Sequence, residues 1–169
     1  MHRRLFATVW CLLLCMVLSG CPLEPPPDYG QSVNDGTAVS AVEQRVFDLI
    51  NHERANHGVP ALVMRSDLCG VARGHSQEMA EYNYLNHENI AGMSAADRLT
   101  NAGIAWRTCG ENIAYNSGYA DPAARAVVSW MESPGHRQNI LNEAFTHTGV
   151  GVAQGASGTY FFTQVFAGF

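Results

Sequence analysis

Residues 148–166 read Thr-Gly-Val-Gly-Val-Ala-Gln-Gly-Ala-Ser-Gly-Thr-Tyr-Phe-Phe-Thr-Gln-Val-Phe. Thr148, Val150 and Val152 alternate with glycines, and residues 160–166 alternate again after a glycine-rich turn over residues 154–158. Successive side chains of a strand point to opposite faces, so this period of two predicts a β-hairpin. The fold therefore contains a sheet, and the segments before the hairpin decide its class.

Working back from the hairpin, four stretches carry apolar residues at helical spacing, each with its own start signal. Possible caps at Ser66 and Asp67 precede the second stretch, which runs to Tyr82, and Asp121-Pro122 opens the fourth. Glycine or proline follows the first, third and fourth stretches, and Pro134-Gly135 should stop the last one near residue 133. The other two starts are capping boxes, formed by Ser40 with Glu43 and by Ser94 with Asp97. Helices that lead into terminal strands predict a layered α+β domain.

The N-terminus has the pattern of a bacterial secretion signal. Arg3 and Arg4 precede an uncharged run over residues 5–18, and Leu18-Ser19-Gly20-Cys21 follows. This tetrapeptide resembles a lipobox, which implies cleavage before Cys21 and lipidation of its thiol; the alternative is an ordinary signal peptide with an incidental cysteine. We expect a signal peptide over residues 1–20, a proline-rich tether over 21–38 and one domain over 39–169.

The charge balance argues against nucleic acid as a partner. Two of the ten arginines precede Cys21 and lysine is absent, whereas all fifteen acidic residues follow, so eight arginines against fifteen acids give the later part a formal charge of −7 with histidine neutral. Phosphate binding needs basic surface, so nucleic acid and anionic headgroups are disfavoured. The membrane partner we expect is reached through lipid on Cys21, at the outer membrane or cell surface.

Two of the five cysteines remain once the signal peptide and Cys21 are set aside. Cys69 and Cys109 would lie in an oxidising compartment, which favours one disulfide between them. Two buried free thiols are the alternative.

Most of the seven histidines are predicted to be structural. His52 and His57 flank an acid but are five residues apart, which is not the spacing of a zinc-protease helix, so both are read as surface residues. His75 lies on the buried stripe of the second helix and is read as a core histidine with a hydrogen bond. His87 and His136 each lie in a segment predicted to be irregular, where side chains commonly line clefts.

Glu111 stands between those two histidines, in Gly110-Glu111-Asn112-Ile113. A carboxylate among apolar residues needs a partner, which a histidine, another cation or backbone amides would supply. Glu132 precedes His136 by four residues, but the proline and glycine between them disfavour a shared helical face.

Several motifs occur in the order found in a known family. They are Gly110–Ile113, then Trp-Met-Glu-Ser-Pro-Gly-His-Arg-Gln-Asn-Ile-Leu over residues 130–141, then Gly-Val-Gly-Val over 149–152 and Thr-Gln-Val-Phe over 163–166. The chain resembles the CAP, or SCP-like, superfamily of cysteine-rich secretory, antigen 5 and pathogenesis-related proteins, in its bacterial branch. The resemblance covers residues 42–167. It implies an α-β-α sandwich with a small antiparallel sheet between helical layers.

The same resemblance implies a cleft with two histidines and two acids that can bind a divalent metal. His87 and Glu111 match the first histidine and the first acid. The second acid of the animal and plant pattern falls on Ser133, with Glu132 one place earlier, and its second histidine falls on Phe161. His136 is the alternative imidazole, so that His87, Glu111 and His136 would form an open zinc site; a structural role in capping a helix or bracing the loop is the alternative for His136.

The leading functional expectation is a noncatalytic, envelope-anchored domain that binds a small apolar ligand such as a sterol or lipid, or a cell-wall ligand. No nucleophile with an adjacent base is evident, and Ser157 lies in a hairpin turn rather than at a strand-to-helix elbow. One alternative is a zinc-dependent hydrolase that uses His87, His136 and Glu111 as general base. Another is a structural surface domain without a ligand.

Overall fold

The computed structural model describes residues 40–169. The predicted signal peptide over 1–20, the lipidated Cys21 and the tether over 21–38 lie outside the described residues. None of the helices within 40–169 is long and apolar enough to cross a membrane.

Four helices begin where the sequence indicates. Helix α1 (Ala41–Asn56) carries the Ser40–Glu43 capping box, and α3 (Ala95–Asn101) carries the Ser94–Asp97 box. Helix α2 spans Ser66–Tyr82 with Arg65 as N-cap, and α4 spans Pro122–Glu132 with Asp121 accepting from the amide of Ala124. The two capping boxes and the Asp121 start are therefore confirmed, whereas the cap expected at Ser66 or Asp67 falls on Arg65, which makes no side-chain capping bond.

A fifth helix, α5 (Pro134–Ile140), corrects the expectation of an irregular segment around His136. Pro134 does end α4, but it occupies the first turn of the next helix, where its missing amide costs nothing. The buried guanidinium of Arg54 holds the end of α5, donating to the carbonyls of Ile140 at 2.6 Å, Asn142 at 3.0 Å and Phe145 at 3.2 Å. Helix α5 is thereby fixed against α1.

The sheet has four strands in the order β1-β3-β4-β2. The predicted hairpin is formed by β3 (His147–Gln154) and β4 (Tyr160–Gly168), and β2 (Thr108–Asn116) pairs antiparallel with β4. The two-residue strand β1 (Val63–Met64) pairs parallel with β3, so the sheet is mixed rather than wholly antiparallel. Strand β2 stands at the edge of the sheet.

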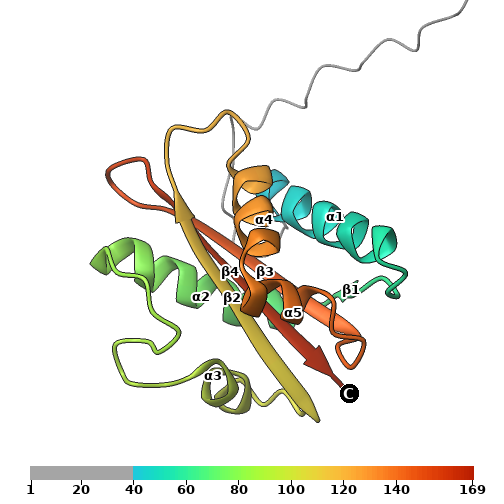
Figure 1. Ribbon diagram of the computed structural model, residues 1–169. Coiled ribbons are helices and arrows are strands. Elements are labelled where there is room, and N and C mark those ends of the chain that lie inside the picture. Colours follow the sequence, from blue (N-terminus) through green and yellow to red (C-terminus); the bar gives the residue numbers. More distant parts are fainter. Residues whose placement is uncertain (1–39) are drawn as a thin grey trace, which may run out of the picture.

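Helices cover both faces of this sheet, which confirms the α-β-α sandwich (Figure 1). On one face, α1 and α4 bury Val46, Ile50 and Trp130 against Phe162 and Phe166. On the other, residues of α2 and α3 pack on alternate residues of β4. Successive side chains of β4 thus pack alternately into two separate hydrophobic cores, one on each face of the sheet.

Two glycines of β3 let α2 approach the sheet. A Cβ added at Gly149 would lie 2.1 Å from the carbonyl carbon of Leu68, and one at Gly151 would lie 2.2 Å from the amide nitrogen of Arg73. No side chain fits in that space. The Gly-Val-Gly-Val motif therefore sets the position of α2 and of the loop that follows it.

Candidate functional site

His87 and Glu111, the two site residues taken from the resemblance, lie together. His87 is in the segment between α2 and α3, and its Nδ1–H donates to Oε1 of Glu111 across 2.9 Å. Glu111 is buried on the α2/α3 face of edge strand β2, whereas the His87 side chain is 56% exposed. The pair thus links a buried carboxylate to an imidazole that is exposed to solvent at the edge of the sheet.

Arg98 of α3 is the second partner of Glu111, and sequence reasoning did not single it out. Its Nη2 donates to Oε2 of Glu111, and its Nη1 donates to the carbonyls of His87 at 2.9 Å and Met93 at 2.8 Å. Arg98 is itself buried. The only available hint was the requirement that a buried carboxylate have a charged partner, which does not say which cation supplies it.

His136 lies on the opposite side of β2 from Glu111, on α5. Its carbonyl accepts from Nδ2 of Asn112, and Nδ2 of Asn139 donates to the carbonyl of Glu111 and to Oδ1 of Asn112. Partial burial lowers the pKa of His136, and the nearby His87 lowers it further. The main chain of His136 therefore braces α5 on the edge strand.

Glu132 is not brought to this cluster. It ends α4 with its side chain 69% exposed, and its carboxylate is 4.0 Å from Nη1 of Arg125. Ser133, which occupies the family's second acid position, caps the junction of α4 and α5.

The implied zinc site does not fit this arrangement. Within residues 40–169, no three His, Cys, Asp or Glu side chains are grouped to hold a metal ion. Both carboxylate oxygens of Glu111 are already engaged, one by an imidazole and one by a guanidinium. A zinc ion at Glu111 would have to compete with these two partners for the carboxylate oxygens.

His52, His57 and His75 lie where the sequence indicated. His52 and His57 are exposed on α1 and just after it, and His147 begins β3. His75 is buried, and its Nε2–H donates to the carbonyl of Asn86 across 2.9 Å. Burial lowers the pKa of His75, and the positive charge of Arg98 adds to that effect.

The expected disulfide is not formed, since Cys69 and Cys109 are both free. The backbone of Cys69 lies over Gly149 of β3, whereas Cys109 belongs to β2, with β4 in between. Two strand spacings are roughly 10 Å, beyond the Cα separation of about 7 Å that a disulfide tolerates. Burial instead raises the pKa of both thiols.

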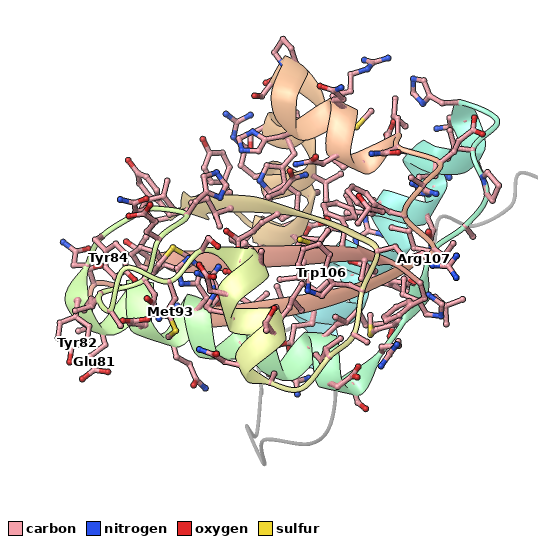
Figure 2. The ribbon with its side chains drawn as sticks, turned by 90° about the horizontal axis from the view of Figure 1, so that it is seen from below. Glu81, Tyr82, Tyr84, Met93, Trp106 and Arg107 are labelled. Atoms are coloured by element: carbon pink, nitrogen blue, oxygen red, sulfur yellow. The ribbon has the colours of Figure 1, made fainter. Side chains whose placement is uncertain are left out.

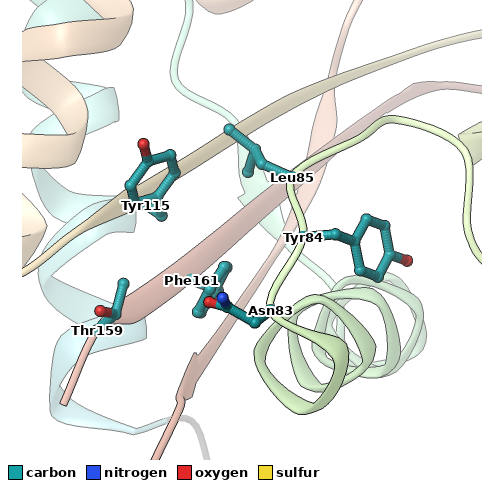
Figure 3. A pocket seen from close by; sticks show the side chains of 6 residues that line it. All are labelled: Asn83, Tyr84, Leu85, Tyr115, Thr159 and Phe161. Atoms are coloured by element: carbon teal, nitrogen blue, oxygen red, sulfur yellow. The ribbon is translucent and has the colours of Figure 1, made fainter. Parts of the chain in front are cut away.

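A pocket opens at the other end of β2 and has a volume of about 380 Å³. Leu85, Tyr115 and Phe161 are turned toward one another there, whereas the Tyr84 ring points away from them (Figure 3). Tyr115 stacks on Phe161 with ring centroids 6.1 Å apart and is 60% exposed. The lining residues are Asn83, Tyr84, Leu85, Tyr115, Thr159 and Phe161.

This pocket was not found from the sequence, because its residues come from three separate segments. Figure 2 places Tyr84 and Tyr82 at one end of the molecule, with Met93 nearby, and Arg107 at the other. Phe161 supplied one hint, since it stands where the resembled family carries its second histidine. The aromatic side chain at that position gives the pocket an apolar wall.

Comparison with known proteins agrees with this architecture. Residues 47–166 match the model of the cysteine-rich secretory protein family, CAP. The Bacillus subtilis protein YkwD is 41% identical over 132 residues, which is 78% of this chain and 49% of YkwD. The Bacillus subtilis membrane protein YlbC is 43% identical over 110 residues, which is 65% of this chain and 31% of YlbC. The chain thus spans half or less of these curated relatives.

Solved structures show the same fold. An extracellular protein of Bacillus anthracis that contains an SCP domain aligns with a TM-score of 0.70 and 34% identity, over 83% of this chain and 45% of that one. An outer surface protein of Borrelia burgdorferi also gives a TM-score of 0.70, at 17% identity over 78% of this chain and 95% of that one. On the match of its sequence motifs, its sandwich and its relatives, the chain belongs to the CAP family of cysteine-rich secretory proteins.

Proposed function

We propose that this CAP domain is an extracytoplasmic, envelope-anchored binder of a small apolar ligand, held in the pocket of Leu85, Tyr115 and Phe161. The observation that carries the proposal is an open pocket of about 380 Å³ in which two exposed side chains, Leu85 and Tyr115, face a buried phenylalanine. Small-molecule sites have volumes of about 300–1,000 Å³ and combine apolar and aromatic side chains with a few polar groups. Exposed apolar side chains gathered at one hollow are costly unless something covers them.

The polar residues of the pocket set the chemistry of the ligand. Asn83 and Thr159 lie beside the aromatic residues and offer an amide and a hydroxyl. The pocket therefore suits an aromatic ring or short acyl segment with one uncharged polar end. Such a group could belong to a lipid or to a larger envelope component.

Catalysis is not part of the proposal. Ser157 is exposed in the hairpin turn, with its hydroxyl 2.9 Å from that of Thr159. Both oxygens of Glu111 accept hydrogen bonds from within the protein, one from His87 and one from Arg98. Neither group is arranged as the base or nucleophile of a hydrolase.

Binding can be tested with N-phenyl-1-naphthylamine, an uncharged dye that fluoresces in apolar pockets. Every described helix and strand lies within residues 40–169, so a chain that starts at Val33 retains the fold. We expect saturable binding that Tyr115→Ala weakens roughly five- to tenfold, since an aromatic contact contributes about 1 kcal/mol. Tyr119→Ala is the matched control, because Tyr119 is 52% exposed and does not line the pocket. Equal affinities of the two variants would reject the pocket.

Anchoring rests on the lipobox-like Leu18–Cys21 and on the extracellular description of the Bacillus anthracis relative. In a bacterial host, the full chain should fractionate with membranes, and Cys21→Ala should remove the acyl mass and release the protein. A Cys21→Ala protein that stays in the membrane fraction would contradict lipid anchoring.

A further inference from the structure

The segment from residue 83 to residue 94 contributes both to the pocket and to the group of charged side chains around Glu111. It supplies Leu85 to the pocket and His87 to the carboxylate cluster. Helix α2 holds it on one side, where His75 donates to the Asn86 carbonyl and Glu78 accepts from the Ile90 amide at 3.0 Å. Turn bonds close its far end, from the Gly92 amide to the Asn89 carbonyl and from the Met93 amide to Oδ1 of Asn89.

Arg98 holds the same segment from the side of α3. Its guanidinium donates to two carbonyls of the segment, those of His87 and Met93, and to the carboxylate of Glu111 on β2. The 83–94 segment, α3 and β2 follow one another along the chain. One buried side chain therefore connects the loop, the short helix and the edge strand.

The charge at this point is balanced within the protein. A buried carboxylate is stable only when it is paired and its oxygens are hydrogen-bonded. The planar fork of arginine meets both needs, since it can serve Glu111 and two carbonyls at once. Arg98 supplies the positive charge that a divalent ion would bring to this carboxylate.

We infer that the guanidinium of Arg98 takes the place of a metal ion beside Glu111. Arg98 is also a positioning residue, because it holds Glu111, His87 and the 83–94 segment together. This inference is independent of the ligand proposed above. It makes Arg98 necessary for an ordered pocket wall although Arg98 does not line the pocket.

Amide hydrogen exchange on the chain from Val33 tests the positioning role. In Arg98→Lys the charge beside Glu111 is kept, but a single ammonium cannot reach all three acceptors. We expect exchange over residues 89–93 to rise about tenfold, as for the loss of one or two hydrogen bonds, while β4 stays protected. Arg98→Met should show a larger rise. Arg125→Lys is the control, because Arg125 makes an exposed ion pair with Glu132 at 4.0 Å and a cation–π contact with Tyr119, and neither partner belongs to the 83–94 segment.

Unchanged exchange over residues 89–93 in Arg98→Lys would overturn the inference, and this variant decides the matter if Arg98→Met does not fold. The claim that Arg98 takes the place of a metal ion is tested by a separate measurement of zinc binding. Zinc chloride is added to metal-free wild-type chain and to Glu111→Gln, and bound zinc is measured. We expect no zinc that depends on Glu111; one zinc per wild-type chain that is lost in Glu111→Gln would overturn the claim.

Discussion

The two ends of strand β2 differ in how they meet solvent. Around Glu111 the strand is buried, and every carboxylate oxygen has a charged or imidazole partner. At Tyr115, four residues on and on the same face, the strand presents an exposed ring to an open pocket. The polar groups at the Glu111 end are satisfied by partners within the protein, whereas the apolar side chains at the Tyr115 end remain exposed. We propose on this difference that the charged cluster supports the 83–94 segment and that a ligand binds at the aromatic end.

The largest expected effect on stability comes from removing one partner of the buried Arg98–Glu111 ion pair. Arg98→Met leaves Glu111 buried without its cation, and we expect the free energy of unfolding to fall by about 3–5 kcal/mol. Replacing both partners, as in Arg98→Met with Glu111→Leu, should recover much of that loss, because no charge is then stranded. Urea denaturation of the two single variants and the double variant measures the coupling. Strictly additive losses would contradict a coupled pair.

Restoring a histidine at Phe161 should have the next largest effect. Phe161 is almost fully buried and packs with Met79 and Ile113. Phe161→His should lower the unfolding free energy by about 2–3 kcal/mol, since it replaces buried apolar surface with a polar ring. It should also weaken N-phenyl-1-naphthylamine binding. Tighter dye binding in this variant would argue against an apolar pocket.

Acid should weaken the protein through His75. The pKa of His75 is lowered in the folded state by burial and by Arg98, so the unfolded chain binds a proton more readily. Stability is therefore full above the ordinary histidine value of 6.5 and falls as pH drops below it. Thermal unfolding between pH 7.5 and 5 measures the effect, and His75→Gln should flatten the profile. An identical slope in His75→Gln would assign the pH dependence to other groups.

The smallest effect is expected for an ion pair outside both regions. Arg125 and Glu132 are partly or largely exposed and 4.0 Å apart. Arg125→Met should change the unfolding free energy by less than about 0.5 kcal/mol, as exposed pairs usually do. A loss of unfolding free energy as large as that of Arg98→Met would show that buried and exposed ion pairs do not differ in this protein.

Local signals predicted the helices well, because each depends on a few neighbouring residues. The capping boxes at Ser40 and Ser94 and the Asp121-Pro122 start all lie at observed helix ends. Strand β2 was missed as a strand because residues 111–114 are buried on both faces, so no polar and apolar alternation marks it. Helix α5 was missed because Pro134 both stops one helix and starts the next.

The site was less predictable than the fold. His87 and Glu111 were each singled out from their local sequence, but only the family resemblance paired them, since nothing in their spacing shows that residues 24 apart are in contact. Arg98 and the pocket depend on how α3, β2 and β4 pack together, and that packing leaves no local pattern in the sequence. The expected disulfide failed for the same reason, because pairing two cysteines requires knowing which strands lie between them.

The most direct test is a two-dimensional ¹H–¹⁵N NMR titration of the chain from Val33 with N-phenyl-1-naphthylamine. We expect saturable shifts centred on Asn83–Leu85, Tyr115 and Thr159–Phe161, with no zinc required. A second groove, between α1 and α4, is lined by Leu49, Val127 and Met131 among others and provides the contrast. Shifts confined to that groove, or shifts that appear at the pocket only after zinc is added, would contradict apolar recognition at the aromatic end of β2.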